Sequence, residues 1–483
     1  MPAVREQSLS MCRLLAFGSL KALLAGVRDF VTRKDTAGVA RRGAAIALAI
    51  RLGSAALAYV AQVVLARLMG QYEYGVFAYT WIWLLVVSAV AMLGLGDSPL
   101  RYIAQLRERN EDAYLRGFLR FALLGVLVGS TIIGAALVAV LPLAGAWIEH
   151  AYLMPMALMA ISIPFIAVQS CLEGIGRSFN WIIPALLPVY ILRHGLLLVV
   201  MVAAVALGVD ATAANAFICL IAVMVVSTAY QAAAILIPLR RVVAPGPRAY
   251  RPAEWARGSA PFAVLYAAQH MASFADVLVL SFFVSPAEIA VYFAATRIIQ
   301  VVNLIPYAAT VGTAHLFSAT HTRGDHDGLQ RLCSHVAVTN FAIATLAVGT
   351  IVVVGERLLG MFGGGFEAGY TPLVILAAGV IARVAAGPAE DVLNMTGHSS
   401  LSASTYLAIV VLSVALAVAL VIPFGVNGAA VASAAALVIR ALWLSRAARK
   451  RLGIGTSVLS LVPPNALSGR FGSRRSPAGA PAE

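Results

Sequence analysis

Charged side chains are scarce in this 483-residue chain: Asp, Glu, Lys and Arg together make up 12% of it, whereas 61% is hydrophobic. Soluble domains usually carry about 25% charged residues, so the composition excludes them. Apolar runs of about 20 residues, long enough to cross a bilayer, recur between residues 42 and 446. They are continuous rather than alternating, which excludes a transmembrane β-barrel. We therefore predict an all-α polytopic membrane protein.

Cysteine is also rare, and its spacing is uninformative. The chain has 4 cysteines, without a CxxC pair or any other ligand spacing. Neither a disulfide framework nor a metal site is therefore indicated. The positions are Cys12, Cys171, Cys219 and Cys333.

The net charge of +14 has its origin in the connections between the apolar runs. Basic residues gather in alternate loops, as the positive-inside rule expects of cytoplasmic segments, so we expect no nucleic-acid partner. Arg67 and Arg357 are exceptions. The pattern predicts a multi-pass protein of the bacterial inner membrane, with both termini cytoplasmic. Its twelve predicted spans begin near residues 42, 74, 117, 151, 181, 212, 258, 288, 332, 370, 401 and 427.

An internal repeat divides these spans into six plus six. Residues 42–78 align with residues 257–293 at one fixed offset, and residues 174–178 weakly resemble residues 395–399. Because six spans return the chain to its starting side, the two lobes must be related by a pseudo-two-fold axis along the membrane normal.

The predicted domains follow from the spans and the charges. They are an interfacial N-terminal segment with an amphipathic helix (1–40), a first six-helix lobe (41–238), a cytoplasmic linker (239–257), a second six-helix lobe (258–450) and a disordered cytoplasmic tail (451–483).

Two sets of motifs resemble a known family. Leu65–Gly70, Tyr74–Tyr79, Leu93–Asp97 and Arg101–Ala104 look like the polysaccharide transporter family of the multidrug/oligosaccharidyl-lipid/polysaccharide exporter superfamily. In the second half, Asp276–Leu280 and Val291–Ile298 resemble that family's seventh and eighth spans.

The resemblance covers roughly residues 40–450, with departures at Met69 and Ala290. It implies a two-lobed, V-shaped fold of twelve helices. It also implies a flippase that moves lipid-linked oligosaccharides from the cytoplasmic to the outer leaflet.

Four arginines interrupt the apolar runs far from the loops: Arg51, Arg193, Arg297 and Arg383. Each lies about 13 Å into its span at the rise of an α-helix. A charge at such depth costs roughly 2.5–3.5 kcal/mol on the lenient insertion scale. Guanidinium groups match the oxygens of a pyrophosphate bidentately, so we expect these arginines to line a cavity for the headgroup. The repeat does not duplicate them, because Arg51 corresponds to Tyr266 and Arg297 to Ile82.

Other polar residues at depth are weaker candidates. His194 and His270 either contact the substrate or form ordinary structural hydrogen bonds. Asp276, Glu390 and Asp391 either couple transport to H⁺ or Na⁺ or pair with Arg297 and Arg383, and we favour pairing. Asp97 and Arg101, at the inner edge of the second span, are candidates for a gate. The prolines Pro184 and Pro188 are expected to bend the fifth span just before Arg193.

The sequence therefore predicts a flippase for polyprenyl-pyrophosphate-linked oligosaccharide repeat units in surface or exopolysaccharide biosynthesis. Its expected partners are the lipid-linked oligosaccharide, the bilayer and the polysaccharide polymerase and export machinery. A multidrug or cation antiporter of the same superfamily is the alternative, although the first six spans lack an acid at cavity depth. An enzyme such as a polysaccharide polymerase or ligase is disfavoured, because the longest outer connection, residues 355–370, is short.

Overall fold

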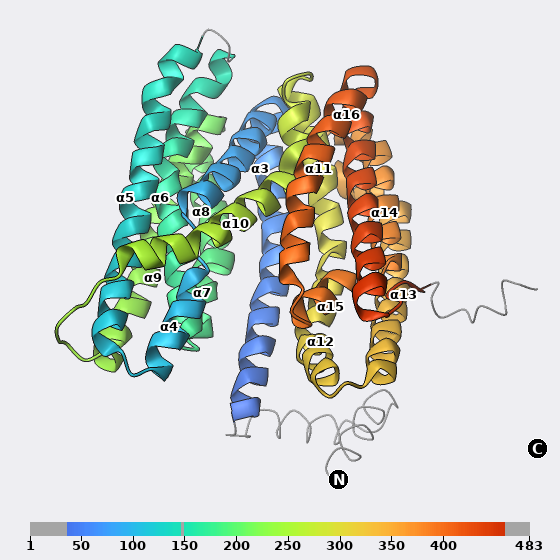
Figure 1. The fold of residues 1–483 in the computed structure, drawn as a ribbon. Helices are drawn as coiled ribbons and strands as arrows, with labels where there is room; N and C mark the ends of the chain where they lie inside the picture. The colour runs from blue at the N-terminus through green and yellow to red at the C-terminus, as the bar shows by residue number, and fades with distance from the viewer. Residues whose placement is uncertain (1–35, 146–148, 459–483) are drawn as a thin grey trace, which may run out of the picture.

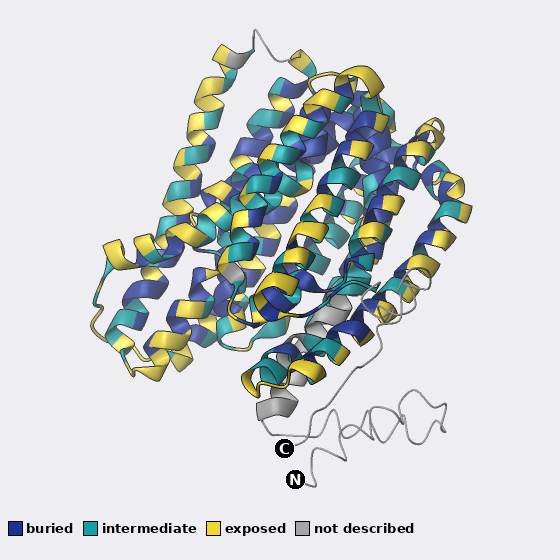
Figure 2. Ribbon diagram, turned by 45° about the vertical axis from the view of Figure 1, so that its right-hand side comes forward, coloured by how far each residue is buried: buried dark blue, intermediate teal, exposed yellow. Residues whose placement is uncertain are grey.

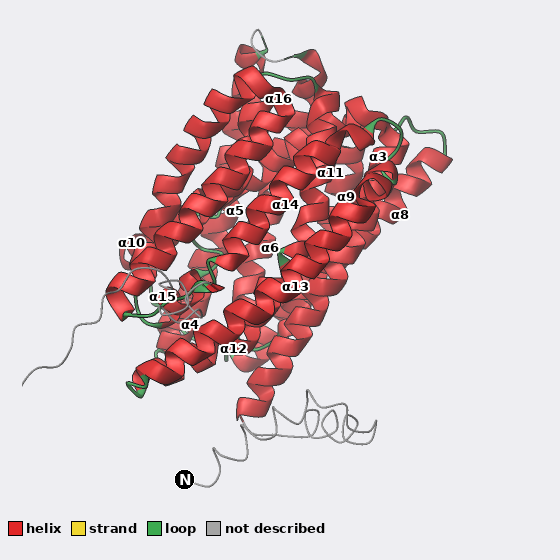
Figure 3. Ribbon diagram, turned by 90° about the vertical axis from the view of Figure 1, so that its right-hand side faces the viewer, coloured by secondary structure: helices red, strands yellow, loops and turns green. Residues whose placement is uncertain are grey.

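The computed structural model describes residues 36–145 and 149–458, and within these ranges the chain consists of helices and connecting loops (Figure 3). The helices are α3 Thr36–Ala91, α4 Ser98–Glu108, α5 Asp112–Ala144, α6 His150–Ser178, α7 Ile182–Leu187, the π-helix η1 Pro188–Leu192, α8 Arg193–Ala206, α9 Ala213–Val242, α10 Pro252–Leu280, α11 Pro286–Val302, α12 Leu304–Thr322, α13 His326–Gly360, the 3₁₀ helix η2 Phe366–Gly369, α14 Tyr370–Ala385, α15 Ala389–Met395 and α16 Ser399–Leu452.

Ten helices of the described chain are long and apolar enough to cross a membrane, and two of them contain two spans each. Helices α3 and α16 hold 56 and 54 residues, and each contains a glycine with positive φ, Gly70 at 74° and Gly425 at 54°. The Tyr74 hydroxyl donates to Gln62 Oε1 at 2.9 Å, although twelve residues of straight helix would separate these positions by about 18 Å. The chain therefore reverses at Gly70, and the predicted twelve helices are confirmed.

The helices form two lobes. Helices α5 to α9 gather on one side and α11 to α16 on the other, with α3 between them (Figure 1). At the offset of the repeat, the turn at Gly70 corresponds to Ser285, which caps α11. Both halves thus open with a helical hairpin. We call the end of the bundle that carries the Gly70 turn the Gly70 end and the opposite end the Thr36 end; the charge pattern predicts the Thr36 end to be cytoplasmic.

The outer surface of the bundle is apolar. Exposed residues follow the outward faces of the helices (Figure 2), and many are large and hydrophobic, including Ile132, Leu346, Val353 and Val411. A surface of this kind suits lipid rather than water.

Helix α10 joins the two lobes. It begins at Pro252, inside the predicted linker, and its first half packs on the first lobe. The Trp255 ring lies 5.5 Å from that of Phe118 and 5.4 Å from that of Phe121, and the Tyr102 hydroxyl donates to the carbonyl of Glu254. The boundary between lobes predicted at residue 258 is therefore not a boundary in the packing, because α10 crosses it.

The two ends of the chain differ in how far they are described. Residues 1–35, with the predicted amphipathic helix, lie outside the described residues, whereas residues 36–40 already belong to α3. The prediction of a disordered tail from residue 451 is wrong for its first residues. Gly455 and Gln330 bond to each other, and the Thr456 hydroxyl donates to the carbonyl of Ala386.

Replacing Trp255 with alanine is expected to destabilise the protein strongly. The side chain is 1% exposed and attaches α10 to the first lobe, and removing a buried aromatic ring costs about 3–5 kcal/mol. The midpoint of thermal unfolding in detergent measures the effect. Trp443→Ala is the matched control, because Trp443 is 44% exposed. Equal losses in the two variants would contradict the packing role of Trp255.

Three of the membrane spans in the described chain are interrupted inside the bundle. The fifth span contains the π-helical segment Pro188–Leu192, which ends where Arg193 begins α8. Asn303 separates α11 from α12, and residues 386–388 separate α14 from α15. Interruptions of this kind in membrane helices are tolerated where they are buried in protein or line a cavity.

Candidate functional site

A cavity of about 560 Å³ lies in the second lobe, between α10, α11, α14 and α16. A second cavity, of about 320 Å³, adjoins it. The two share four lining residues, Asn303, Arg383, Leu437 and Arg440. Two of these four are cationic, so the junction of the cavities is the most basic part of this interior.

Arg383 is placed by the break in the tenth span. It lies in the last turn of α14, and its Nη2 donates to Asn303 Oδ1 at 2.9 Å. Its Nε is buried and has no hydrogen-bond partner among the described residues. One hydrogen bond thus connects the break at Asn303 with the break that follows Arg383. The Nε–H of Arg383 stays available as a donor.

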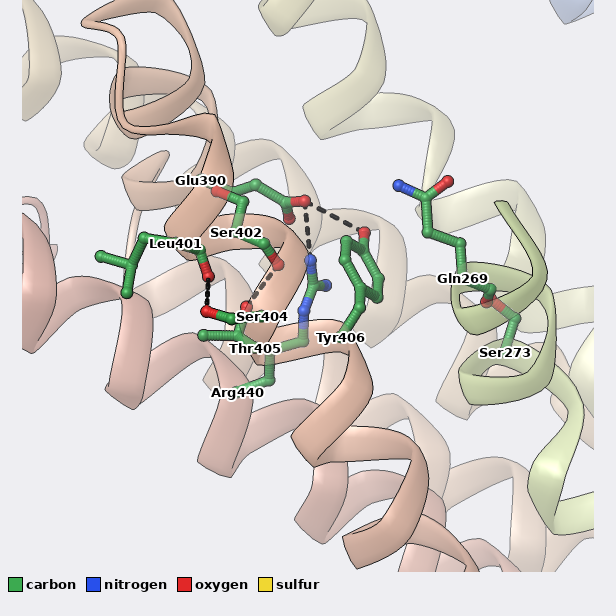
Figure 4. A network of polar contacts seen from close by, with 9 residues as sticks. All are labelled: Gln269, Ser273, Glu390, Leu401, Ser402, Ser404, Thr405, Tyr406 and Arg440. Carbon is green, nitrogen blue, oxygen red and sulfur yellow. Dashed lines mark hydrogen bonds and ion pairs between the residues drawn. The ribbon is translucent and has the colours of Figure 1, made fainter. Parts of the chain in front are cut away.

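Arg440, in α16, is the cation that the sequence analysis missed. Its Nη2 lies 2.6 Å from Glu390 Oε1, and its guanidinium group stacks 3.7 Å from the centre of the Tyr406 ring (Figure 4). The Tyr406 hydroxyl donates to the same Glu390 oxygen at 3.0 Å. The available signal was an arginine inside the twelfth span, shortly before the basic cluster that ends it.

In the first lobe, Arg193 and Arg51 lie on aromatic rings. Arg193 is 9% exposed; its guanidinium carbon is 5.8 Å from the centre of the Trp81 ring, and its Nη1 donates weakly to Gln169 Oε1 at 3.5 Å. Its Nε is buried without a hydrogen-bond partner among the described residues. Arg51 lies 4.8 Å from the centre of the Tyr190 ring. Tyr190 belongs to the π-helical segment, which thereby connects the two arginines.

Acids in the first lobe are closer to these arginines than the sequence indicated. Glu173 forms an ion pair with Arg177 at 3.6 Å and also interacts electrostatically with Arg51, Arg193 and Asp97. Glu173 nevertheless lies near the end of α6, and the absence of an acid at cavity depth in the first six spans stays a prediction.

Arg297 lies between the lobes. Its guanidinium carbon is 3.9 Å from the centre of the Phe293 ring, and Nη1 donates to Gln300 Oε1 at 3.0 Å. It interacts electrostatically with Tyr74 of the first lobe and with Asp276 of the second. Its Nε, too, is buried and lacks a hydrogen-bond partner in the described chain.

The four predicted arginines thus occupy three places rather than one surface. Their depths also differ. About 28 Å of helix separate Arg51 from the Gly70 turn, whereas Arg193, Arg297 and Arg383 lie roughly 16–20 Å along their helices from that end. Of the four, Arg383 lines the cavities of the second lobe.

The two histidines make local hydrogen bonds. The Nδ1–H of His194 donates to the carbonyl of Tyr190 at 2.9 Å, and that of His270 donates to the carbonyl of Tyr266 at 3.0 Å. Each bond spans one helical turn. His270 also lines the larger cavity, so its role towards a substrate stays a prediction.

The acids of the second lobe have partners other than those expected. Asp276 accepts from the Tyr292 hydroxyl at 2.5 Å and from its neighbour's backbone N–H, and Arg297 interacts with it only electrostatically. Glu390 forms its ion pair with Arg440 and also interacts electrostatically with Arg383, so its pairing with Arg383 stays a prediction. Asp391 lines the smaller cavity. Coupling of any of these acids to H⁺ or Na⁺ stays a prediction.

Asp97 and Arg101 lie beside α10. Asp97 precedes α4 and lines a small pocket with Ser170, Phe262 and Tyr266. Arg101 is exposed, with its guanidinium carbon 5.7 Å from the centre of the Tyr102 ring. Asp97 therefore borders the first half of α10, and a gating role for Asp97 and Arg101 stays a prediction.

The lobes contact each other at the Gly70 end. Arg67 Nε donates to the carbonyl of Met361 at 2.6 Å, Gln71 Nε2 donates to that of Gly364 at 3.2 Å, and the Tyr59 hydroxyl donates to that of Leu358 at 3.3 Å. Tyr74 stacks edge-on against Phe293 and Phe366. Arg67, an exception to the charge pattern, thus belongs to a contact that we call the outer seal. It comprises these residues of α3, the connection 361–366 and the start of α11.

No protein-family model and no curated protein match the chain. Solved structures match its fold. An inward-facing multidrug resistance transporter of the MATE family, in the MOP superfamily, aligns at a TM-score of 0.72 with 15% identity, over 84% of this chain and 98% of that one. An outward-facing structure of a transporter of that family aligns at 0.60 with 16% identity, over 87% and 97%.

A third similar structure is a MOP superfamily transporter from Pyrococcus furiosus. It aligns at a TM-score of 0.60 with 16% identity, over 88% of this chain and 97% of that one, and its description states that reverse polarity of the binding pocket suggests a different function. These three structures are of transporters, and at such identities the likeness shows the fold alone, with its two lobes of membrane helices.

Proposed function

We propose that this protein is an alternating-access transporter that moves polyprenyl-pyrophosphate-linked oligosaccharides across the cytoplasmic membrane. The outer seal closes the Gly70 end, and the better match is to an inward-facing transporter. Both observations support a state that receives cargo from the Thr36 end. The lipid-facing outer surface leaves a polyprenyl tail in the bilayer while the headgroup enters between the lobes.

The main support for an anionic cargo is that three buried arginines have donors unpartnered in the described chain, whereas two nearby acids already have hydrogen-bond partners. Arg193, Arg297 and Arg383 each keep a buried Nε without a partner among the described residues. By contrast, Asp276 and Glu390 already accept bonds from neighbouring side chains. A buried charged donor left unpaired is costly, and phosphate oxygens satisfy guanidinium donors well. A diphosphate headgroup that reaches any one of these places supplies the acceptors that the protein leaves open there.

A multidrug or cation antiporter is the second candidate. The MATE transporters of similar fold support it, and so do Asp276, Glu390 and Asp391, which line the cavities of the second lobe. Glu173, near Arg51, adds an acid to the first lobe. Acids as well as arginines therefore surround the cavities, so the charge of these residues distinguishes a flippase from a cation antiporter less clearly than the sequence indicated.

Deletion of the gene is expected to strand lipid-linked repeat units in the inner leaflet, with tolerance of cationic dyes unchanged. The purified protein in liposomes should then move a fluorescent lipid-linked oligosaccharide between leaflets, measured as protection from a membrane-impermeant quencher. Extrusion of ethidium by the liposomes, without movement of the lipid-linked oligosaccharide, would contradict the flippase and favour the antiporter.

A further inference from the structure

The junction of the two cavities contains an incompletely paired arginine. Arg440 forms an ion pair with Glu390, with Nη2 2.6 Å from Oε1, but both its Nη2 and its Nε are buried without a hydrogen-bond partner among the described residues. Its side chain is 13% exposed. Arginine binds a carboxylate or a phosphate most strongly through two parallel N–H···O bonds, so this ion pair is not the best that the guanidinium group can form.

Both of the contacts described for Glu390 involve the same carboxylate oxygen. Its Oε1 accepts a hydrogen bond from the Tyr406 hydroxyl and forms the ion pair with Arg440. Glu390 belongs to the first turn of α15, directly after the break at residues 386–388, whereas Arg440 and Tyr406 belong to α16. The acid and its two partners therefore belong to separate helices, and the acid can separate from them without unwinding either helix.

Further polar groups surround Arg440. Arg383 interacts electrostatically with both Arg440 and Glu390 and has a buried Nε without a partner in the described chain. Ser413 lines the larger cavity, and its buried hydroxyl also lacks a hydrogen-bond partner among the described residues. Gln269 of α10 faces the Arg440 and Tyr406 pair from across the cavity (Figure 4). Three residues with donors unpartnered in the described chain, Arg383 of α14 and Ser413 and Arg440 of α16, thus line the same cavity.

We propose that Arg440 and Arg383 form an oxyanion-binding subsite, and that Glu390 is a resident counter-anion which the cargo displaces. A phosphate or carboxylate group of the cargo bonds both Nε and Nη2 of Arg440, while Glu390 keeps Arg440 compensated when no cargo is bound. The shared chemistry is that of an oxyanion, supplied either by the diphosphate of the lipid headgroup or by an acidic sugar. This proposal rests on the proposed function but concerns binding alone.

Titration calorimetry on the full-length protein in nanodiscs tests the subsite, with inorganic pyrophosphate and glucuronate as probes at constant ionic strength. Glu390→Gln is expected to bind at least one probe roughly ten-fold more tightly, because one charge-assisted interaction no longer competes for Arg440. Arg440→Lys should bind about ten-fold more weakly, since a lysine lacks the planar fork. Arg446→Gln, an exposed position on the same helix, is the control and should bind like the wild type.

The results distinguish a headgroup oxyanion from a sugar oxyanion, and they test the subsite separately from the flippase function. Preference for pyrophosphate assigns the subsite to the headgroup, and preference for glucuronate assigns it to the sugar; both support it. Glu390→Gln binding no tighter than the wild type, or no binding of either probe to the wild type and Glu390→Gln, overturns it. Because binding is measured without transport, failure of the flippase assay with intact oxyanion binding would reject the proposed cargo and retain the subsite.

Discussion

Replacing Arg51 and Arg193 together with alanine is expected to lower transport of lipid-linked oligosaccharide by at least roughly 100-fold, because each hydrogen bond to a charged group contributes about 1.5–3 kcal/mol. Both guanidinium groups lie on aromatic rings in the first lobe, and the buried Nε of Arg193 has no hydrogen-bond partner among the described residues. The leaflet-protection assay in liposomes measures the rate, and accumulation of repeat units in the inner leaflet measures it in cells.

Two comparisons keep this result interpretable. Arg120→Ala with Arg331→Ala removes the same charge from exposed positions, one in each lobe, and should leave the transport rate unchanged. The amount of protein in the membrane must match between the two double variants, because Arg193 is buried. Wild-type transport by the Arg51 and Arg193 variant at equal protein amount would reject the first lobe as part of the headgroup site.

Replacing Gly75 with alanine is expected to open the outer seal. A Cβ at this position would overlap the carbonyl oxygen of Pro286, at the start of α11, so the lobes must separate there. Overpacking of a close contact costs about 1–3 kcal/mol, which corresponds to a roughly 5- to 150-fold shift between two conformations. The distance between spin labels at Tyr72→Cys and Met361→Cys, both exposed and on opposite lobes, should increase.

Gly349→Ala is the matched control for the seal, because a Cβ there meets no atom within 4 Å. It should leave the distance between the labels as in the unsubstituted protein. The same distance distribution in Gly75→Ala as in Gly349→Ala would show that the contact of Gly75 with Pro286 does not hold the lobes together.

The span positions were predictable because their causes are local. Every backbone N–H and C=O inside a bilayer must find a partner, so each apolar run becomes a helix without reference to its neighbours. The reversals at Gly70 and Gly425 are likewise set by backbone geometry that glycine adopts without steric cost. The break before Arg193 followed from Pro184 and Pro188 for the same reason.

The partners of the deep charges were not predictable in this way. Glu390 lies in α15 and Arg440 in the part of α16 after Gly425, and apolar patterning assigns both to span interiors without pairing them. Arg51 and Tyr266, equivalent in the repeat, interact electrostatically across α3 and α10. Their proximity depends on how the helices cross, which no single span encodes.

The sequence by itself determined the class of the protein, its twelve helices, the two related halves and the presence of arginines at depth, because hydropathy and turn chemistry act over a few residues. Only the tertiary structure decided that these arginines occupy three separate places, that Arg440 joins Arg383 at the junction of two cavities, and that Glu173 and Glu390 accompany the cations. The physical reason is that a charge buried in a membrane protein takes its environment from whichever helices pack around it, and that packing brings together residues far apart along the chain.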